Sequence, residues 1–261
     1  MSLIDVHCHL DSSVYHDPAG VCRESLQAGV RNIIAVGTGY VSNGYILDLQ
    51  ARYPEQVLAA LGLHPERQDT SWQEVEQVIE QIRQHRSRIV AIGEIGLPYY
   101  ALQAQHMTPE QARQRQAFLR TLLHHAVHLG LPVALHAPHD AAEVALRLLL
   151  QQPPPSALFH WHKSSPEVTA AICKAGYFIS VTPEICYRER DRELVRRTPL
   201  DNLLLETDGP WAYNGEFSGQ RTTPAFVARV AEEIARLKDI PYADVVQATS
   251  ANARRWLQQT P

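Results

Sequence analysis

The sequence predicts an α/β fold, a single (β/α)8 TIM barrel in which eight parallel strands alternate with helices. Two observations support this prediction. Short aliphatic runs recur along the 261 residues, and longer segments with helical hydrophobic spacing separate them. Nearly all of these runs are continuous rather than alternating in polarity, which is typical of parallel strands covered on both faces. No change in composition divides the chain, so we expect one domain over residues 1–261.

We expect the eight strands at Leu3–His7, Asn32–Val36, Val57–Leu63, Ile89–Glu94, Pro132–His136, Ala157–His160, Tyr177–Val181 and Asn202–Glu206. Helix starts lie between them. SWQE at Ser71–Glu74 and TPEQ at Thr108–Gln111 each place a hydroxyl cap three residues before Glu or Gln. Ser165 and Thr223 each precede a proline in the first helical position. An open doubly wound sheet is the alternative, but eight parallel strands favour a closed barrel.

Composition narrows the class of protein further. Hydrophobic residues make up 45% of the chain and charged residues 20%, as in ordinary globular proteins. The formal net charge of −4 argues against non-specific coating of nucleic acid, so any nucleic acid would bind in a local pocket. The chain shows neither a signal peptide nor an apolar run long enough for a membrane span. Four cysteines without CxxC spacing suggest reduced thiols and a cytoplasmic protein. We expect no membrane association and no obligate protein partner.

The segment Ile4–Ser13, IDVHCHLDSS, raises the first question about function. If the segment begins as a strand, then Asp5, His7 and His9 project from the same face. Three groups that can bind a metal ion on one face need hydrogen-bonding partners or an ion, because unpaired buried polar groups cost a few kcal/mol each.

Other polar residues recur where the predicted strands end. They are His64 in LGLHP, Glu94 in IGEIG, His136 in VALHA, His160 in LFHWH, and Glu206 and Asp208 in LLLETDGP. In (β/α)8 barrels the functional face lies at the carboxyl ends of the strands. Imidazole and carboxylate groups suit Zn, Mn, Fe, Ni or Co, and Mg remains open. These groups exceed one tetrahedral shell, so we expect one or two divalent metal ions, with Glu94 as the natural bridge between two.

Together these motifs resemble the TatD-like metal-dependent hydrolases, barrel members of the amidohydrolase superfamily that include deoxyribonucleases. The shared motifs are DVHCHL, LGLHP, IGEIGL, PVALHA, FHW and LLLETDGP, and the resemblance extends to TSANARRWL near the C-terminus. It implies that His7, His9 and Asp208 bind one ion. It also implies that His136 and His160 bind a second ion and that Glu94 bridges the two. The catalytic residues would be Glu94 and Asp208, with Asp208 orienting or deprotonating the attacking water.

The chain departs from the family where substrate would bind. Pro98 follows GL where the family has Asp, and Pro138 stands where the family commonly has Arg. HWHKSS brings in His162 and Lys163, and QRTTP keeps only Arg221 and Pro224 of the family's Arg-Asn-Glu-Pro. The residues expected to bind an anionic substrate are His64, Arg221, His139 and Lys163. A DNA or nucleotide substrate is therefore implied by the resemblance alone.

Two alternatives remain open. The same centre could cleave a lactone, a cyclic amide or another C–N bond, although many such enzymes bridge their metal ions with a modified lysine. This chain has no lysine before Lys163, which favours the nuclease-like branch. The other alternative is a metal-binding barrel without catalytic activity; retention of both Glu94 and Asp208 argues against it. Tyr187–Arg197, YRERDRELVRR, is expected to be an exposed helix with paired charges rather than a nucleic-acid-binding patch.

Overall fold

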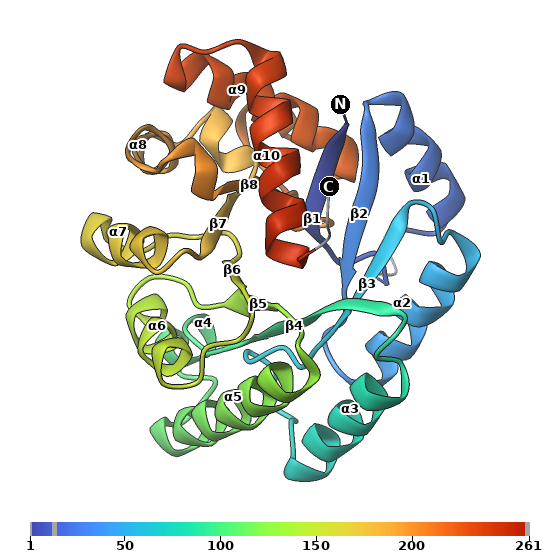
Figure 1. Cartoon of the computed structure of the whole chain (residues 1–261), viewed down its shortest axis with the longest axis vertical. Helices are drawn as coiled ribbons and strands as arrows, with labels where there is room; N and C mark the ends of the chain where they lie inside the picture. The colour runs from blue at the N-terminus through green and yellow to red at the C-terminus, as the bar shows by residue number, and fades with distance from the viewer. Residues whose placement is uncertain (1, 12–14, 259–261) are drawn as a thin grey trace.

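The computed structural model describes residues 2–11 and 15–258, and these form a (β/α)8 barrel. Eight parallel strands pair in sequence order, β1 with β2 through β7 with β8 (Figure 1). Their bounds are β1 Leu3–Cys8, β2 Val30–Val36, β3 Val57–Leu61, β4 Ile89–Gly96, β5 Val133–His136, β6 Ala157–Phe159, β7 Phe178–Val181 and β8 Leu203–Leu205. Each overlaps a strand expected from the sequence, so the predicted fold is confirmed.

Helices surround the barrel as an outer layer (Figure 1). They are α1 Pro18–Gln27, α2 Tyr40–Arg52, α3 Trp72–Gln84, α4 Tyr100–Gln103, α5 Pro109–Leu129, α6 Ala141–Gln151, α7 Pro166–Lys174, α8 Glu189–Arg197, α9 Val227–Lys238 and α10 Tyr242–Leu257. Ser71, Thr108 and Ser165 cap α3, α5 and α7 as expected. Thr223 precedes a short 3-10 turn instead, and α9 begins only at Val227. Within residues 2–11 and 15–258 no helix is both long and apolar enough to cross a membrane.

The barrel closes between β1 and the segment that follows β8. An isolated parallel bridge joins Cys8 to Gly209, and the Asp208 N–H donates to the carbonyl oxygen of His7 at 3.0 Å. Asp5 strengthens this seam, because its carboxylate accepts from the Thr207 N–H at 3.1 Å and from the Thr207 hydroxyl at 2.5 Å. The register of β1 shifts after Asp5, so the regular alternation expected for Asp5, His7 and His9 does not hold along the strand.

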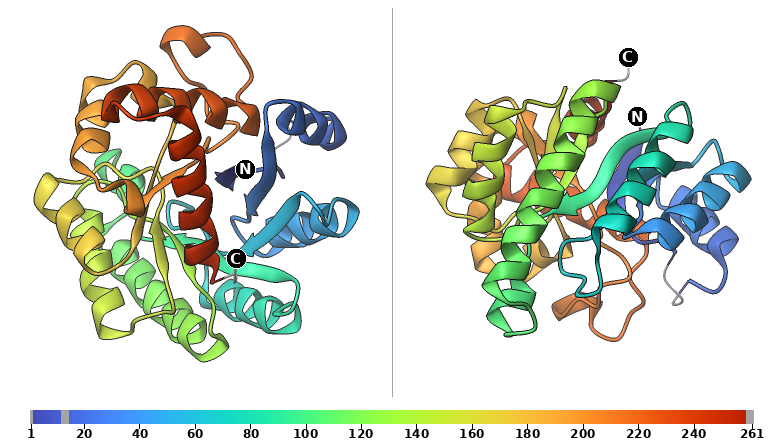
Figure 2. Two further views of the ribbon diagram at one scale, coloured as in Figure 1. Left: turned by 45° about the horizontal axis from the view of Figure 1, so that its top comes forward. Right: turned by 90° about the horizontal axis from the view of Figure 1, so that it is seen from below.

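The interior of the barrel is apolar, and α10 closes it at one end. Trp256 of α10 is fully buried among inward-facing strand residues such as Ile34 and Leu158. Its indole N–H donates to the carbonyl oxygen of Val133 at 3.2 Å. In Figure 1, α10 lies in front of the strands at the middle of the ring of helices. Figure 2 (right) shows both marked termini at one end and the loops after β3 and β8 extending from the other. The polar strand ends lie at this second end.

Candidate metal centre

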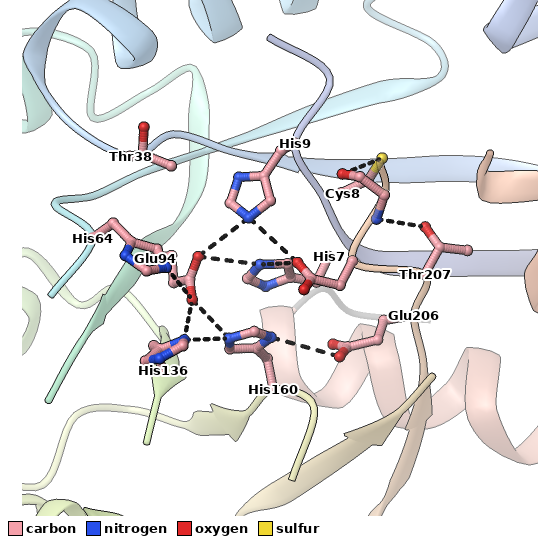
Figure 3. A network of polar contacts seen from close by, with 12 residues as sticks. His7, Cys8, His9, Thr38, His64, Glu94, His136, His160, Glu206 and Thr207 are labelled. Carbon is pink, nitrogen blue, oxygen red and sulfur yellow. Dashed lines mark hydrogen bonds and ion pairs between the residues drawn. The ribbon is translucent and has the colours of Figure 1, made fainter. Parts of the chain in front are cut away.

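Six side chains that the sequence predicts as metal ligands lie close together at the carboxyl ends of the strands. Figure 3 labels five of them, His7, His9, Glu94, His136 and His160. The six side chains come from the end of β1 (His7, His9), from β4 (Glu94), from the ends of β5 and β6 (His136, His160) and from the segment after β8 (Asp208). Tight strand packing allows Glu94 to reach the centre. A Cβ at Gly62, after β3, would lie 2.4 Å from backbone atoms of Glu94, so only glycine fits there.

One oxygen of Glu94 faces the residues of the barrel seam. Oε2 lies 3.4 Å from the Nε2 atoms of both His7 and His9. Asp208 Oδ1 lies 3.5 Å from His7 Nε2 and 3.3 Å from His9 Nε2. Two imidazole nitrogens and two carboxylate oxygens therefore surround one small space. His7, His9 and Glu94 form one group whose atoms could hold a metal ion.

The other oxygen of Glu94 faces a second set of imidazoles. Oε1 lies 2.7 Å from His160 Nε2, 2.9 Å from His136 Nδ1 and 3.4 Å from His64 Nε2. His64, Glu94 and His136 form another group that could hold an ion. The sequence assigned His64 to substrate binding, whereas in the structure it lies with the residues of this group. Glu94 thus presents one oxygen to each of two neighbouring groups.

Several atoms of the centre are buried and have no protein hydrogen-bond partner. Among the described residues, the partnerless atoms include His7 Nε2, Glu94 Oε2 and Asp208 Oδ1. Such atoms are costly unless something binds them. All three converge on the same space, and a divalent cation prefers imidazole and carboxylate ligands of this kind. The residues therefore fit a metal ion on the chemistry and geometry of this site.

The charge states favour a cation. Burial alone would raise the pKa of Glu94, but the imidazoles of His64, His160 and His7 hold it well below its usual value. Asp208 behaves in the same way, since burial would raise its pKa but its contacts with His9, His7 and His160 together hold it below its usual value. Burial would lower the pKa of His9, but its contacts with Asp208 and Glu94 raise it to about 10. The two carboxylates are therefore ionised and attract positive charge, whether from protons or from a metal ion.

A buried carboxylate also lies behind the imidazole of His160. Glu206 Oε1 lies 3.5 Å from His160 Nδ1, and the Ser180 hydroxyl donates to Glu206 Oε2 at 2.5 Å. His7, His160 and Glu206 form a further group of atoms close enough to hold an ion. A buried carboxylate behind a histidine ligand sets its tautomer and makes it a better ligand. The sequence placed Glu206 at the end of a strand but assigned it no role.

Glu66 supports His136 in the same way, and the sequence gave no indication of it. Glu66 Oε1 lies 3.1 Å from His136 Nε2. The same carboxylate accepts the backbone N–H groups of Tyr99, Tyr100 and Ala101 at 2.8–2.9 Å. Burial would raise the pKa of Glu66, but these hydrogen bonds lower it to about 2. Glu66 therefore ties the loop after β3 to the start of α4 and to the centre.

A pocket of about 380 Å3 opens over the centre. Its lining includes His64, Glu66, Glu94, Tyr100, His136, Pro138, His160, Trp161, Lys163, Glu184, Arg188, Asp208 and Trp211. Arg188 belongs to the segment expected to be only an exposed, paired helix, so that prediction was incomplete. The sequence could not show that Arg188 precedes α8 at a point where the chain passes the pocket.

The four residues expected to bind substrate are not all at this pocket. Lys163 and His64 line it. The ring of His139 instead packs against Tyr99, with ring centroids 4.5 Å apart. Arg221 is half-exposed, lies 3.7 Å from a carboxylate oxygen of Glu24 and faces the ring of Tyr15.

Fold and centre together define a barrel of the metal-dependent hydrolase type, with imidazole and carboxylate groups at the carboxyl ends of its strands. The family model described as TatD related DNase matches residues 4–258. The chain therefore belongs to the TatD-related DNase family of metal-dependent hydrolases.

Individual relatives resemble the chain over almost its whole length. An uncharacterized metal-dependent hydrolase of Haemophilus influenzae is 30% identical, with 97% of this chain and 98% of the relative covered. The human deoxyribonuclease TATDN3 is also 30% identical, over 97% of this chain and 93% of its own. The crystal structure of YJJV, a TatD homolog from Escherichia coli, superposes with a TM-score of 0.88 at 28% identity and covers 99% of this chain and 98% of its own.

Proposed function

We propose that this chain hydrolyses phosphodiester bonds in DNA or nucleotides, using two divalent metal ions. The observation that carries the proposal is the placement of Glu94, whose two oxygens face two separate groups of imidazoles. In the proposed centre His7, His9 and Asp208 bind one ion. His136 and His160, joined by His64, would hold the other, and Glu94 would offer one carboxylate oxygen to each.

Asp208 is the proposed proton acceptor. Its carboxylate is ionised, lies at the mouth of the centre and lines the pocket. Bound divalent ions supply Lewis acidity, which lowers the pKa of water toward about 7 and stabilises negative charge on a phosphoryl oxygen. Asp208 then orients the attacking water and takes its proton, while Glu66 and Glu206 hold the imidazoles of His136 and His160 in position.

The DNA substrate is supported by the family and by the names of relatives such as the human deoxyribonuclease TATDN3. The volume of about 380 Å3 is near the lower limit for small-ligand sites. It suits a chain end or a nucleotide better than the middle of a duplex. His64 and Lys163 are the proposed substrate contacts, because both line this pocket. His139 and Arg221 remain weaker proposals, since their present partners are Tyr99 and Glu24.

Cleavage of a lactone, a cyclic amide or another C–N bond is the second candidate. One observation favours it: the aromatic side chains of Tyr100, Trp161 and Trp211 line the pocket. Such a wall accepts a small cyclic substrate as readily as a nucleobase. We also propose a cytoplasmic location, on the grounds that Cys8, Cys22, Cys173 and Cys186 are all free thiols.

Metal content and substrate should be tested together. The purified protein is stripped with a chelator and titrated separately with Mg, Mn and Zn. Each form is then assayed on single-stranded DNA, on a simple phosphodiester, on a lactone and on a cyclic amide. We expect one to two ions per chain and cleavage of DNA. A protein that binds no divalent ion contradicts the centre, and rapid lactone or amide cleavage without DNA cleavage supports the second candidate.

A further inference from the structure

Lys163 is a nearly buried ammonium group that faces the pocket. Its side chain is 9% exposed, and its Nζ atom lies 3.6 Å from the centroid of the Trp161 ring. The nearest carboxylate oxygen, Glu184 Oε2, is also 3.6 Å away, which is too far for a hydrogen bond. Within the described part of the chain, no acceptor is recorded for the N–H groups of Lys163. Because Lys163 lines the pocket, an anion bound there could accept from these three N–H donors.

Glu184 does not need Lys163 as a hydrogen-bond donor. Its Oε2 accepts from the Trp161 indole N–H at 3.1 Å and from Arg190 at 3.3 Å. Its Oε1 lies 2.9 Å from Arg188 Nε. The carboxylate is therefore already satisfied by three donors. Glu184 also faces the Lys163 ammonium as an ion pair at 3.6 Å, but it takes no hydrogen bond from it, so the N–H donors of Lys163 stay available to another partner.

Arg188 stands beside Lys163 on the same wall. Its Nε atom faces Glu184, and the structure records no acceptor among the described residues for its two terminal nitrogens. The side chain is 46% exposed, so these donors can reach a bound molecule. Arg190 is held differently, because it pairs with both Glu184 and Asp191. Among the described residues, Lys163 and Arg188 are therefore the cationic side chains that line the pocket and keep donors without an acceptor.

Aromatic rings frame this cationic wall. Trp161 and Trp211 meet nearly edge to face, with ring centroids 5.2 Å apart and an interplanar angle of 74°. Trp211 is 55% exposed and can accept a flat ring. Trp161 has φ of 38°, in the left-handed region that bulky residues avoid. Backbone strain of this kind is concentrated at functional sites, and here it accompanies a tryptophan ring beneath the Lys163 ammonium.

We propose that Lys163 and Arg188 bind a second phosphate group of the substrate, next to the phosphodiester held at the metal centre. The inference rests on the proposed phosphodiesterase function and specifies its substrate. Charge-assisted hydrogen bonds to the flanking phosphate would satisfy the free donors of both side chains. A neighbouring base would lie against Trp211. The preferred substrate is therefore a nucleotide chain end that carries two phosphates, rather than an isolated diester.

A dinucleotide series tests this inference. The substrates are thymidylyl-thymidine with one internal diester, the same molecule with a 5′-terminal phosphate, and the same molecule with a 3′-terminal phosphate. The metal-loaded protein should cleave one of the phosphorylated forms with a kcat/KM about tenfold or more above the unmodified form, the scale of one charge-assisted contact. In the Lys163→Met and Arg188→Met variants that ratio should fall toward 1. Lys163→Arg retains a positive charge and should keep a ratio clearly above 1.

Lys174→Met is the matched control, because Lys174 is exposed on α7 and does not line the pocket. It should keep the full preference. Circular dichroism and metal content establish that each variant is folded. Equal cleavage of all three substrates by the unmodified protein overturns the inference, as does a preference that survives in the Lys163→Met/Arg188→Met double variant. Failure to cleave any of the three substrates with Mg, Mn or Zn overturns the proposed phosphodiesterase function as well.

Discussion

The two ends of the barrel both contain buried side chains, but the buried polar atoms are paired at one end and unpaired at the other. At the end closed by α10, Trp256 packs among aliphatic strand residues and its one polar atom is paired with Val133. At the carboxyl ends of the strands, buried nitrogen and oxygen atoms of His7, Glu94 and Asp208 have no protein partner. The first end can only contribute stability. The second end bears a cost in stability that only a bound ion relieves.

This difference shows how one barrel can place residues that stabilise the fold at one end and residues that bind metal and substrate at the other. The strands are stiff, so changes at one end need not disturb the other. Substitutions at the centre should alter metal binding and turnover, whereas substitutions around α10 should alter the free energy of unfolding.

Glu94→Gln should produce the largest effect. The amide cannot offer a negative oxygen to both groups of imidazoles, so we expect the bound metal to fall below one ion per chain. Turnover should fall roughly 10³-fold or more, because metal chemistry supplies several kcal/mol. Metal analysis and steady-state kinetics measure both, with Glu76→Gln on the exposed face of α3 as the control. Normal metal content in Glu94→Gln would show that Glu94 does not bridge the two ions. It would also show that the carboxyl end of the barrel does not depend on this carboxylate for metal binding.

Asp208→Asn should abolish chemistry while retaining more of the metal. The asparagine side chain has nearly the same shape as aspartate, but its amide does not accept a proton. We therefore expect turnover to fall about 10²- to 10⁴-fold. His7, His9 and Glu94 remain to hold an ion. Single-turnover kinetics and metal analysis separate the two effects, and Asp48→Asn on exposed α2 serves as the comparison. Turnover within tenfold of the unmodified protein would exclude Asp208 as the base.

Trp256→Ala tests the opposite end. Removing a fully buried indole from the barrel floor should lower the free energy of unfolding by about 3–5 kcal/mol. Urea denaturation measures this loss. The half-exposed Trp211→Ala should change stability by only about 0.5 kcal/mol. Metal affinity, measured on folded Trp256→Ala at low temperature, should match that of the unmodified protein. A large loss of metal affinity would show that the two ends are coupled after all.

Glu66→Gln should have the smallest effect of the four. The neutral amide is a weaker partner for His136, and its NH2 group faces backbone N–H donors of α4. We expect metal affinity to fall about 10- to 100-fold, as for other groups behind metal-binding histidines. Competition with a fluorescent chelator provides the measurement. Unchanged metal affinity would show that Glu66 only accepts the backbone N–H groups at the start of α4 and does not support the metal centre.

Most of the fold and the convergence of the six proposed ligands could be predicted from the sequence. Hydrophobic runs set the strands, and the rule that barrel sites lie at carboxyl ends of strands brings His7 and Asp208 together although 200 positions separate them. The supporting residues could not be predicted. Glu66 has no strand-end position that marks it, and its partner His136 is 70 positions away.

The positions of charged residues outside the strands were harder still to predict from the sequence. Arg188 lies in a stretch whose mixed charges suggest a solvated helix, and only tertiary packing places it on the pocket wall. Arg221 shows the reverse case, because a motif match suggested a substrate contact while the fold pairs it with Glu24. Side-chain pairing of exposed charges depends on loops, whose paths local sequence patterns do not specify.

The position of α10 has a consequence for biosynthesis. Trp256, near the end of the chain, fills one end of a barrel whose first strand begins at Leu3. During translation the strands can therefore associate before α10 is synthesised. The apolar interior at that end of the barrel stays exposed to water until α10 has left the ribosome and packed. A nascent chain halted before that helix should remain sensitive to proteases.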